Sequence, residues 1–258
     1  MTHRIGLVWL SFCALTLAAS PALAAFHLME IEQVIGGVGG DASAQAVQLK
    51  MRSIGQNFLS GSAQLVVRDA AGANPVILST FPATVITGGA CREILIATAG
   101  FSAKTTPAAV ANFTMLPIPA SYLPAGSLTF EGVLPPTIYW RVSWGNGSYS
   151  GSQTVALGVP PTANDSDGTT SPAFTSALPS TGAQALRFTP PCSTDSTNSL
   201  AQYAVTAGAA TFTNNALTNF TVLAPPAVPL LPGTAKLLLP VILGLGLAAF
   251  AYRRRQRS

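Results

Sequence analysis

Charged residues are scarce in this chain of 258 residues. They make up 9% of it, against about 25% in ordinary globular proteins. The formal net charge of +4 comes from the two ends, because residues 25–235 hold seven basic and nine acidic residues and carry a net charge of −2. That region has no basic run interleaved with aromatic residues, so the sequence predicts no nucleic-acid partner. Its solubility must come from Ser, Thr, Asn, Gln and Gly, a composition common in exported β-rich proteins.

Catalytic motifs are also few. The chain has two histidines, and His27 is the only one beyond residue 24. No Gly-x-Ser-x-Gly turn occurs, since Gly147-Ser148-Tyr149-Ser150-Gly151 has tyrosine in the central position. The sequence therefore argues against a Ser-His-Asp hydrolase and predicts no enzyme.

Acidic residues offer another route to hydrolysis, because two carboxyl groups across a cleft cleave glycosidic bonds. The sequence does not place any two of the acids on opposite sides of a cleft, so a secreted hydrolase is the least favoured alternative. The acids available are Glu30, Glu32, Asp69, Glu93 and Glu131.

Two incomplete metal-binding patterns are present. Cleavage before Ala25 would leave a free amine with His27 in third place, a nitrogen set that suits Cu(II) or Ni(II). Asp165 and Asp167 lie in Asn-Asp-Ser-Asp-Gly, which has the first half of a calcium loop but lacks its bidentate glutamate. The alternatives are a residue that merely begins a strand and a polar turn, and the sequence predicts no metal and no cofactor.

Cysteine is rare, with three residues in the chain. Cys13 lies within an apolar leader, which leaves Cys91 and Cys192 for the rest of the protein. Outside the cytoplasm two such cysteines are more often paired than free, so the sequence predicts a disulfide. A catalytic thiol is the alternative, but no suitable base lies nearby in the sequence.

The first 24 residues have the three parts of a secretory signal peptide. Arg4 supplies the early positive charge, Ile5 to Ala19 form the apolar segment, and Ala22-Leu23-Ala24 is a small-x-small cleavage site. The mature chain should begin at Ala25. A leader retained as a membrane anchor is the alternative, which Pro21 and the alanines after it weaken.

The last part of the chain predicts a membrane helix. Residues 237–252 are almost wholly apolar and would form a helix of about 24 Å, close to the ~30 Å hydrocarbon core. Residues 253–258 form a basic tail, which the positive-inside rule keeps in the cytoplasm while the rest lies outside. A Pro-rich stalk over residues 224–236 precedes the helix. The alternative, a buried helix of a soluble core, fits poorly with four terminal arginines.

Val228-Pro229-Leu230-Leu231, the apolar helix and Arg253, Arg254, Arg255 and Arg257 together resemble bacterial C-terminal sorting signals of the PEP-CTERM class. The similarity is greatest to variants with Ile-Pro-Thr-Leu or Val-Pro-x-x. The resemblance implies recognition by an exosortase-type transpeptidase and removal of the tail as the protein reaches the cell surface or exopolysaccharide matrix. Leu230 and Leu231 stand where the class has the glutamate of Pro-Glu-Pro, so a permanent single-pass anchor stays open.

Residues 25–223 predict an all-β ectodomain, an immunoglobulin-like β-sandwich with one short helix. The helix is expected after Thr106, with Pro107 in its first position. A hairpin is expected over 138–157, because Asn146-Gly147 favours a tight turn. Further strands are expected at 28–35, 47–52, 64–69, 76–81, 93–98, 185–189, 201–206, 211–214 and 217–222.

The first two of these strands carry Ile31-Glu32-Gln33-Val34 and Val47-Gln48-Leu49. They resemble the opening strands of bacterial lamin-tail-like surface domains, which implies a sandwich fold.

Trp140 and Trp144 are four residues apart on one expected strand and face the same side. If that side is exposed they can stack on a sugar ring, but burial in the core of the sandwich is the favoured alternative. The favoured interpretation is thus an exported, membrane-anchored or sorted surface or matrix protein of structural or adhesive type. A carbohydrate-binding surface module that uses the two tryptophans is the main alternative.

Overall fold

The computed structural model describes residues 28–61, 63–133, 136–145, 148–151, 174–192 and 202–225. The chain divides into two compact units with the boundary after Ala224, and the described residues up to that point belong to the first. No helix within these described ranges is long and apolar enough to cross a membrane. The predicted signal peptide, sorting motif, apolar helix and basic tail lie outside the described residues.

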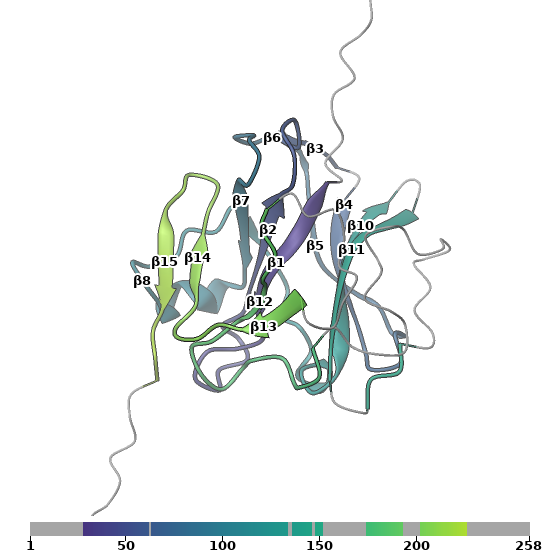
Figure 1. The fold of residues 1–258 in the computed structure, drawn as a ribbon, viewed down its shortest axis with the longest axis vertical. Helices are drawn as coiled ribbons and strands as arrows, with labels where there is room; N and C mark the ends of the chain where they lie inside the picture. The colour runs from purple at the N-terminus through teal and green to yellow at the C-terminus, as the bar shows by residue number, and fades with distance from the viewer. Residues whose placement is uncertain are drawn as a thin grey trace, which may run out of the picture. The chain divides into compact units, whose positions relative to one another are not determined.

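The first unit is all-β, as predicted, and its largest sheet has six strands (Figure 1). Neighbouring strands are antiparallel except for the last pair, which is parallel. Alternating apolar residues place one face of each central strand in a core. In spatial order the strands are β13 (Tyr203–Val205), β12 (Leu186–Phe188), β1 (Met29–Ile35), β2 (Ala46–Met51), β7 (Glu93–Ala97) and β9 (Phe113–Thr114).

A four-stranded antiparallel sheet packs against one face of the six-stranded sheet. Ile31 and Leu49 of the larger sheet share a buried cluster with Leu65, Phe130 and Trp140 of the smaller. This is the main core of the protein, about which the two sheets stack in a sandwich-like arrangement (Figure 1). In spatial order the strands are β11 (Pro136–Trp144), β10 (Gly126–Val133), β4 (Ala63–Arg68) and β5 (Val76–Thr80).

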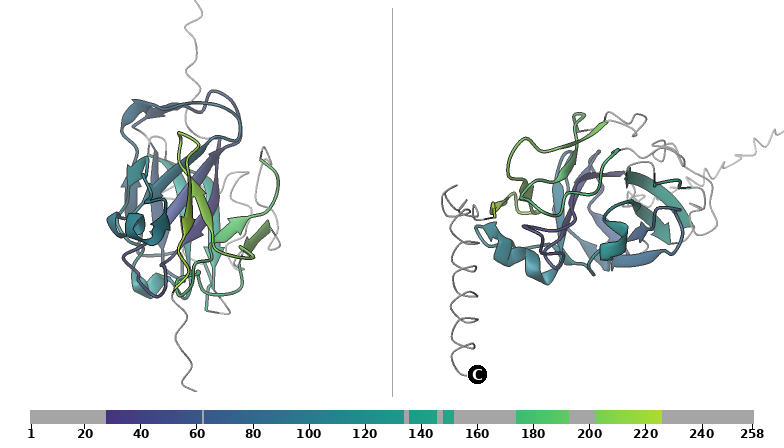
Figure 2. Two further views of the ribbon diagram at one scale, coloured as in Figure 1. Left: turned by 90° about the vertical axis from the view of Figure 1, so that its left-hand side faces the viewer. Right: turned by 90° about the horizontal axis from the view of Figure 1, so that it is seen from below.

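A third, smaller layer covers one end of the opposite face of the six-stranded sheet (Figure 2). It consists of β14 (Thr211–Thr213), β15 (Asn219–Val222) and β8 (Thr105–Thr106). Phe212 and Phe220 pack there with Ile35 and Leu95 in a second buried cluster. Two 3₁₀ helices, η1 (Ala99–Lys104) and η2 (Ala120–Tyr122), and a strand pair, β3 (Phe58–Ser60) and β6 (Ala83–Val85), complete the described part.

The helix predicted after Thr106 is wrong. Thr106 is extended and pairs with Thr221 of β15, and a residue before proline is sterically disfavoured in the α region. The Thr105 hydroxyl still accepts the Ala109 N–H at 2.8 Å, a cap-like bond without a helix. The helical turns lie instead at η1 and η2.

The predicted strands from 28 to 98 and from 185 to 222 match β1, β2, β4, β5, β7 and β12 to β15 within a few residues. The predicted hairpin over 138–157 is confirmed only in its first strand, β11. Its antiparallel neighbour within the described residues is β10, which was not predicted. The Asn146-Gly147 turn and residues 152–157 lie outside the described ranges.

A β-bulge gives the outer face of the six-stranded sheet its mixed character. Between Ile31 and Gln33 the pairing of β1 with β2 shifts, so Glu32 is an extra residue opposite Gln48. Beyond the bulge Gln33 donates to Gln48, and farther along the face Ile35 and Ala46 lie in the apolar cluster beneath the third layer. Glu30 before the bulge and Glu32 at the bulge do not belong to that cluster.

Candidate functional site

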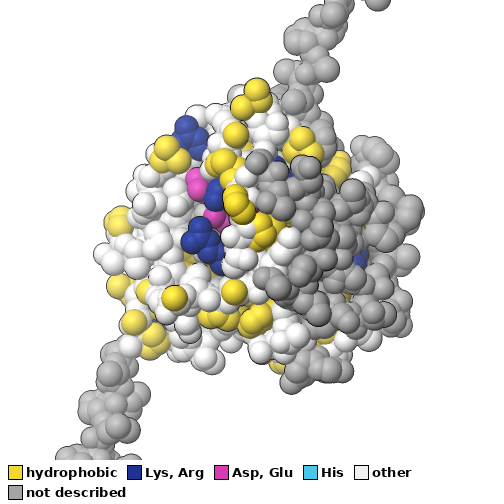
Figure 3. All heavy atoms as spheres, in the orientation of Figure 1, with side chains coloured by type: hydrophobic (Ala, Val, Ile, Leu, Met, Phe, Trp, Pro, Cys, Tyr) yellow, Lys and Arg dark blue, Asp and Glu magenta, His cyan; other side chains and the backbone are white. Residues whose placement is uncertain are grey.

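Ionisable side chains gather at one place on the six-stranded sheet (Figure 3). They come from four adjacent strands, β12, β1, β2 and β7. We call this cluster the polar face. It consists of Glu30, Glu32, Lys50, Glu93 and Arg187.

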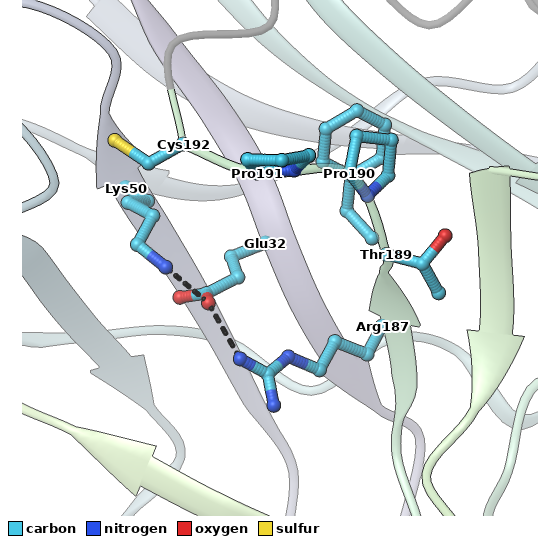
Figure 4. Close-up of a pocket in the computed structure, with 8 residues that line it drawn as sticks. Glu32, Lys50, Arg187, Thr189, Pro190, Pro191 and Cys192 are labelled. Atoms are coloured by element: carbon cyan, nitrogen blue, oxygen red, sulfur yellow. Dashed lines mark hydrogen bonds and ion pairs between the residues drawn. The ribbon is translucent and has the colours of Figure 1, made fainter.

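Glu32 is the centre of the polar face. One carboxylate oxygen accepts from the Lys50 ammonium at 2.5 Å and from Arg187 Nη2 at 3.2 Å. The other accepts from Gln48 Nε2 at 2.5 Å. Its side chain is only 4% exposed, so this buried charge is compensated by two cations and a neutral donor. Figure 4 shows Lys50 and Arg187 approaching it from either side.

Glu30 lies two residues before Glu32 on β1, and it is paired across the sheet with Lys50. Burial, and then the neighbouring Glu32 charge, raise the pKa of Glu30 to about 8. Its Oε2 is buried and has no hydrogen-bond partner among the described residues. Glu30 is therefore largely protonated at neutral pH.

Glu93 closes the cluster on the β7 side. Its Oε1 lies 3.7 Å from Lys50 Nζ. Burial first, and then the charge of Glu32, raise the pKa of the Glu93 carboxyl group. Lys50 thus stands between two acids and offsets part of their mutual repulsion.

A hollow of about 440 Å³ opens over Glu32, Lys50 and Arg187. Its other described walls come from the end of β12 and the residues that follow it, and Figure 4 shows that segment passing over the polar face. The segment is held down by the disulfide between Cys91 and Cys192, whose Cα atoms are 5.6 Å apart. These other lining residues are Phe188, Thr189, Pro190, Pro191 and Cys192.

No protein-family model matches the chain, and no curated protein or solved structure is significantly similar to it. The chemistry of the polar face must therefore be read from its own residues. The Glu32 carboxylate already accepts from three side chains, so both of its oxygens are occupied by groups of the protein itself. The arrangement is suited to holding cationic side chains in fixed positions.

The predicted disulfide between Cys91 and Cys192 is confirmed. This bond connects the residues just before β7 with the residues after β12, so it lies across the polar side of the six-stranded sheet. The Cys91 N–H also donates to the Met51 carbonyl at 2.7 Å, which holds the residues before β7 against the end of β2 at the same place.

Trp140 and Trp144 are fully buried, each 0% exposed. Trp140 Nε1 donates to the Tyr203 hydroxyl at 2.8 Å, and Trp144 Nε1 donates to the Tyr122 carbonyl at 2.9 Å. Both rings lie between the two large sheets, so the exposed stacking surface that the carbohydrate-binding alternative requires is not there. The sequence pattern is explained by the core, because the two residues share the inner face of β11.

The structure brings three of the five candidate acids together, Glu30, Glu32 and Glu93. Glu131 lies on the other sheet and pairs with Arg68 at 2.6 Å. Asp69 accepts the N–H groups of Ala71 and Ala73 in the turn between β4 and β5. The described ranges hold no group of three His, Cys, Asp or Glu that could bind a metal, and His27, Asp165 and Asp167 lie outside them.

Sequence reasoning missed Lys50 and Arg187 as members of the site. A signal for Lys50 was present, because the alternation in β1 and β2 puts Glu30, Glu32 and Lys50 on the same kind of face. Arg187 carried no such signal, since its strand pairs with β1 from 154 residues away. The contact depends on sheet order, which periodicity does not specify.

Proposed function

We propose that this chain is an exported bacterial surface or matrix protein of structural or adhesive type, without catalysis. In this proposal the leader directs export, and the C-terminal helix anchors the protein or is processed by an exosortase-type enzyme. The partners are the secretion machinery and the membrane, with no nucleic acid. The observation that carries the proposal is the Cys91–Cys192 disulfide, because such bonds persist outside the reducing cytoplasm.

The described residues also support the non-catalytic part of the proposal. The carboxylate oxygens of Glu32, at the centre of the polar face, are saturated by donors from Gln48, Lys50 and Arg187. Glu131 is likewise taken up by Arg68 and by the Thr129 hydroxyl. An immunoglobulin-like sandwich remains the proposed finer class of the fold, supported by the two mainly antiparallel sheets that share one core.

Cell fractionation with intact-mass measurement tests the proposal. We expect the chain in the membrane or surface fraction, without residues 1–24 and with its disulfide formed. A variant in which Arg253, Arg254, Arg255 and Arg257 are all replaced by serine should lose retention in the membrane. Arg92→Ser, which removes a positive charge from the β domain, should fractionate like the wild type.

Full-length protein in the cytosol, with its leader present and its thiols reduced, would contradict the proposal. Retention of the four-serine variant in the membrane, with the same mass as the wild-type product, would contradict the sorting step alone.

A further inference from the structure

Arg187 carries unused hydrogen-bonding capacity at the mouth of the hollow. Its side chain is 53% exposed. A guanidinium has five N–H donors, and within the described part of the chain Arg187 gives a bond to Glu32 alone, from Nη2 at 3.2 Å. The rest of its planar fork is available to an acceptor that enters the hollow.

The guanidinium is held in place before any ligand arrives. Glu32 is buried and anchored by Gln48 and Lys50, so its contact with Arg187 fixes one corner of the fork. A preorganised arginine loses less conformational entropy on binding than a free surface arginine. This separates Arg187 from a solvated surface charge.

The charge balance of the lining favours an anion. Among the described residues, the ionisable side chains that line the hollow are Lys50, Arg187 and Glu32, two cations and one anion. Glu93 contacts Lys50 but does not line the hollow, and the buried Glu30 carboxyl is mostly neutral at pH 7. The net positive charge therefore lies where a ligand would enter.

The remaining walls suit a compact organic body. Pro190 and Pro191 provide aliphatic ring surface, whereas the ring of Phe188, which also lines the hollow, packs in the main core against Trp140. A volume of about 440 Å³ falls within the roughly 300–1,000 Å³ of small-molecule sites. A ligand with a ring-sized body and one charged group matches both parts of the lining.

We propose that this hollow binds an organic carboxylate. The Arg187 guanidinium pairs with the carboxylate group, and the Pro190-Pro191 segment covers the rest of the ligand. Arginine is suited to this role because its fork matches the two oxygens of a carboxylate. Lys50 adds positive charge behind the fork. The proposal concerns the site alone and does not depend on how the chain is sorted.

Titration of the purified full-length chain, with its disulfide oxidised and in detergent micelles, tests the proposal. The probes are glucuronate, glucose and cyclohexanecarboxylate, and calorimetry measures the binding of each. We expect glucuronate to bind and glucose, which lacks the carboxylate, to bind at least about tenfold more weakly. Equal binding of cyclohexanecarboxylate would assign the site to small carboxylates in general, and preference for glucuronate would assign it to sugar acids.

Variants of Arg187 complete the test. Arg187→Gln should weaken glucuronate binding about tenfold or more. Arg187→Lys should recover part of it, because it keeps the charge but loses the fork. Lys104→Gln is the matched control, since Lys104 is also a surface cation paired with an acid, Asp41, and should bind like the wild type.

Three results would overturn the proposal: equal affinity for glucose and glucuronate, unchanged affinity in Arg187→Gln, or no binding of either carboxylate. Circular dichroism and intact mass of each variant establish that its fold and disulfide are intact, so a loss of binding is not a loss of folding.

Discussion

At the scale of single residues, Glu30 makes stability depend on pH. Its carboxyl group ionises near pH 4.5 when unfolded and near pH 8 in the folded protein. Between these values the unfolded chain has released a proton that the folded chain keeps, so rising pH favours unfolding. The contribution of Glu30 is fully present below about pH 4.5 and is lost as the pH rises through 8.

Glu30→Gln should remove this dependence. Relative to the variant, the free energy of unfolding of the wild type should fall by up to about 1.4 kcal/mol per pH unit across that window. Urea denaturation at several values between pH 4 and 9 measures the difference. Parallel pH profiles for the two proteins would mean that the folded-state pKa of Glu30 is ordinary.

Asp41→Asn is the contrasting control. Hydrogen bonds from the Ser43 hydroxyl and N–H, with a further one from Lys104, lower the pKa of Asp41. The stabilisation from an acid of this kind is present above its unfolded pKa and is lost as the pH falls. Any change in this variant should therefore appear on the acid side, below pH 4, and not near pH 8.

What the sequence reveals about single residues depends on whether their partners are near in the chain. The pairing of Cys91 with Cys192 was identified because they are the only two cysteines after the predicted leader, and the predicted location outside the cytoplasm favours disulfides. The burial of Trp140 and Trp144 was the favoured alternative and is confirmed, but the strand pattern shows only that the two residues share a face, not which face is internal. That choice depends on the sheet packed against it, and Tyr203, which receives the Trp140 N–H, is 63 residues away.

At the scale of elements, one hydroxyl links three strands of the two large sheets. The Tyr203 hydroxyl on β13 accepts from Trp140 of β11 and donates to the Ile31 carbonyl of β1 at 2.6 Å. Tyr203→Phe leaves the buried indole N–H without its acceptor and should lower the free energy of unfolding by about 1–3 kcal/mol. Chemical denaturation measures this loss.

Tyr122→Phe is the matched control, because it also removes a tyrosine hydroxyl, one that donates to the Asn74 carbonyl at an exposed position. Water can replace that bond, so the loss should be smaller. Equal losses in the two variants would mean that the buried inter-sheet bond of Tyr203 contributes no more to stability than the exposed bond of Tyr122.

The third layer is held by aromatic packing. Phe212 is fully buried and makes an edge contact with Phe101, with ring centroids 5.2 Å apart. Phe212→Ala should destabilise the protein by about 3–5 kcal/mol. Leu217→Ala, on the same hairpin but 57% exposed, should change stability by less than about 0.5 kcal/mol. Thermal unfolding of both variants compares them directly.

Element prediction succeeded where a strand alternates in polarity, as β2 does, or has a clear turn beside it, as β4 and β5 do. It missed β10, although Leu128 and Phe130 alternate there with Ser127, Thr129 and Glu131, whose side chains are all buried. Arg68 explains the burial of the polar side, because it pairs with Glu131 and also donates to the Thr129 hydroxyl. The alternation could have indicated the strand, but the pairing with Arg68 could not be predicted, because it depends on β4 lying beside β10.

At the scale of the whole molecule, the disulfide closes a loop with a sequence separation of 101 residues. In the chain-entropy model a loop of that length stabilises the folded state by about 4.7 kcal/mol, and losses of 2–5 kcal/mol are typical. Replacing Cys91 and Cys192 together by serine should produce a loss in that range in urea denaturation. Reducing agent should have the same effect on the wild type and none on the variant.

Cys13→Ser is the control, because Cys13 lies in the leader that the sequence predicts to be removed. Its product should match the wild type in mass and stability. A double-serine variant as stable as the wild type would show that the disulfide contributes little to the folded state.

The class of the fold followed from the sequence, but its layering did not. Short alternating strands and frequent turns indicated an all-β protein, which the described residues confirm. The third layer over β1, β2 and β7 was not predicted, because the pattern around Phe212 and Phe220 indicates two short strands without indicating which face of which sheet they cover. Their role depends on Ile35 and Leu95, which lie on the face of the central sheet away from the main core.

The position of β1 in the six-stranded sheet has a consequence for how the chain is made. This strand lies near the beginning of the chain but in the interior of its sheet, between β2 and β12, and Gln33 is opposite Arg187. During synthesis from the N-terminus β1 is made early, but the edge of β1 that pairs with β12 has no partner strand until most of the domain has been synthesised. Such distant pairing slows folding, and in the proposed export this delay favours passage of the unfolded chain through the secretion machinery.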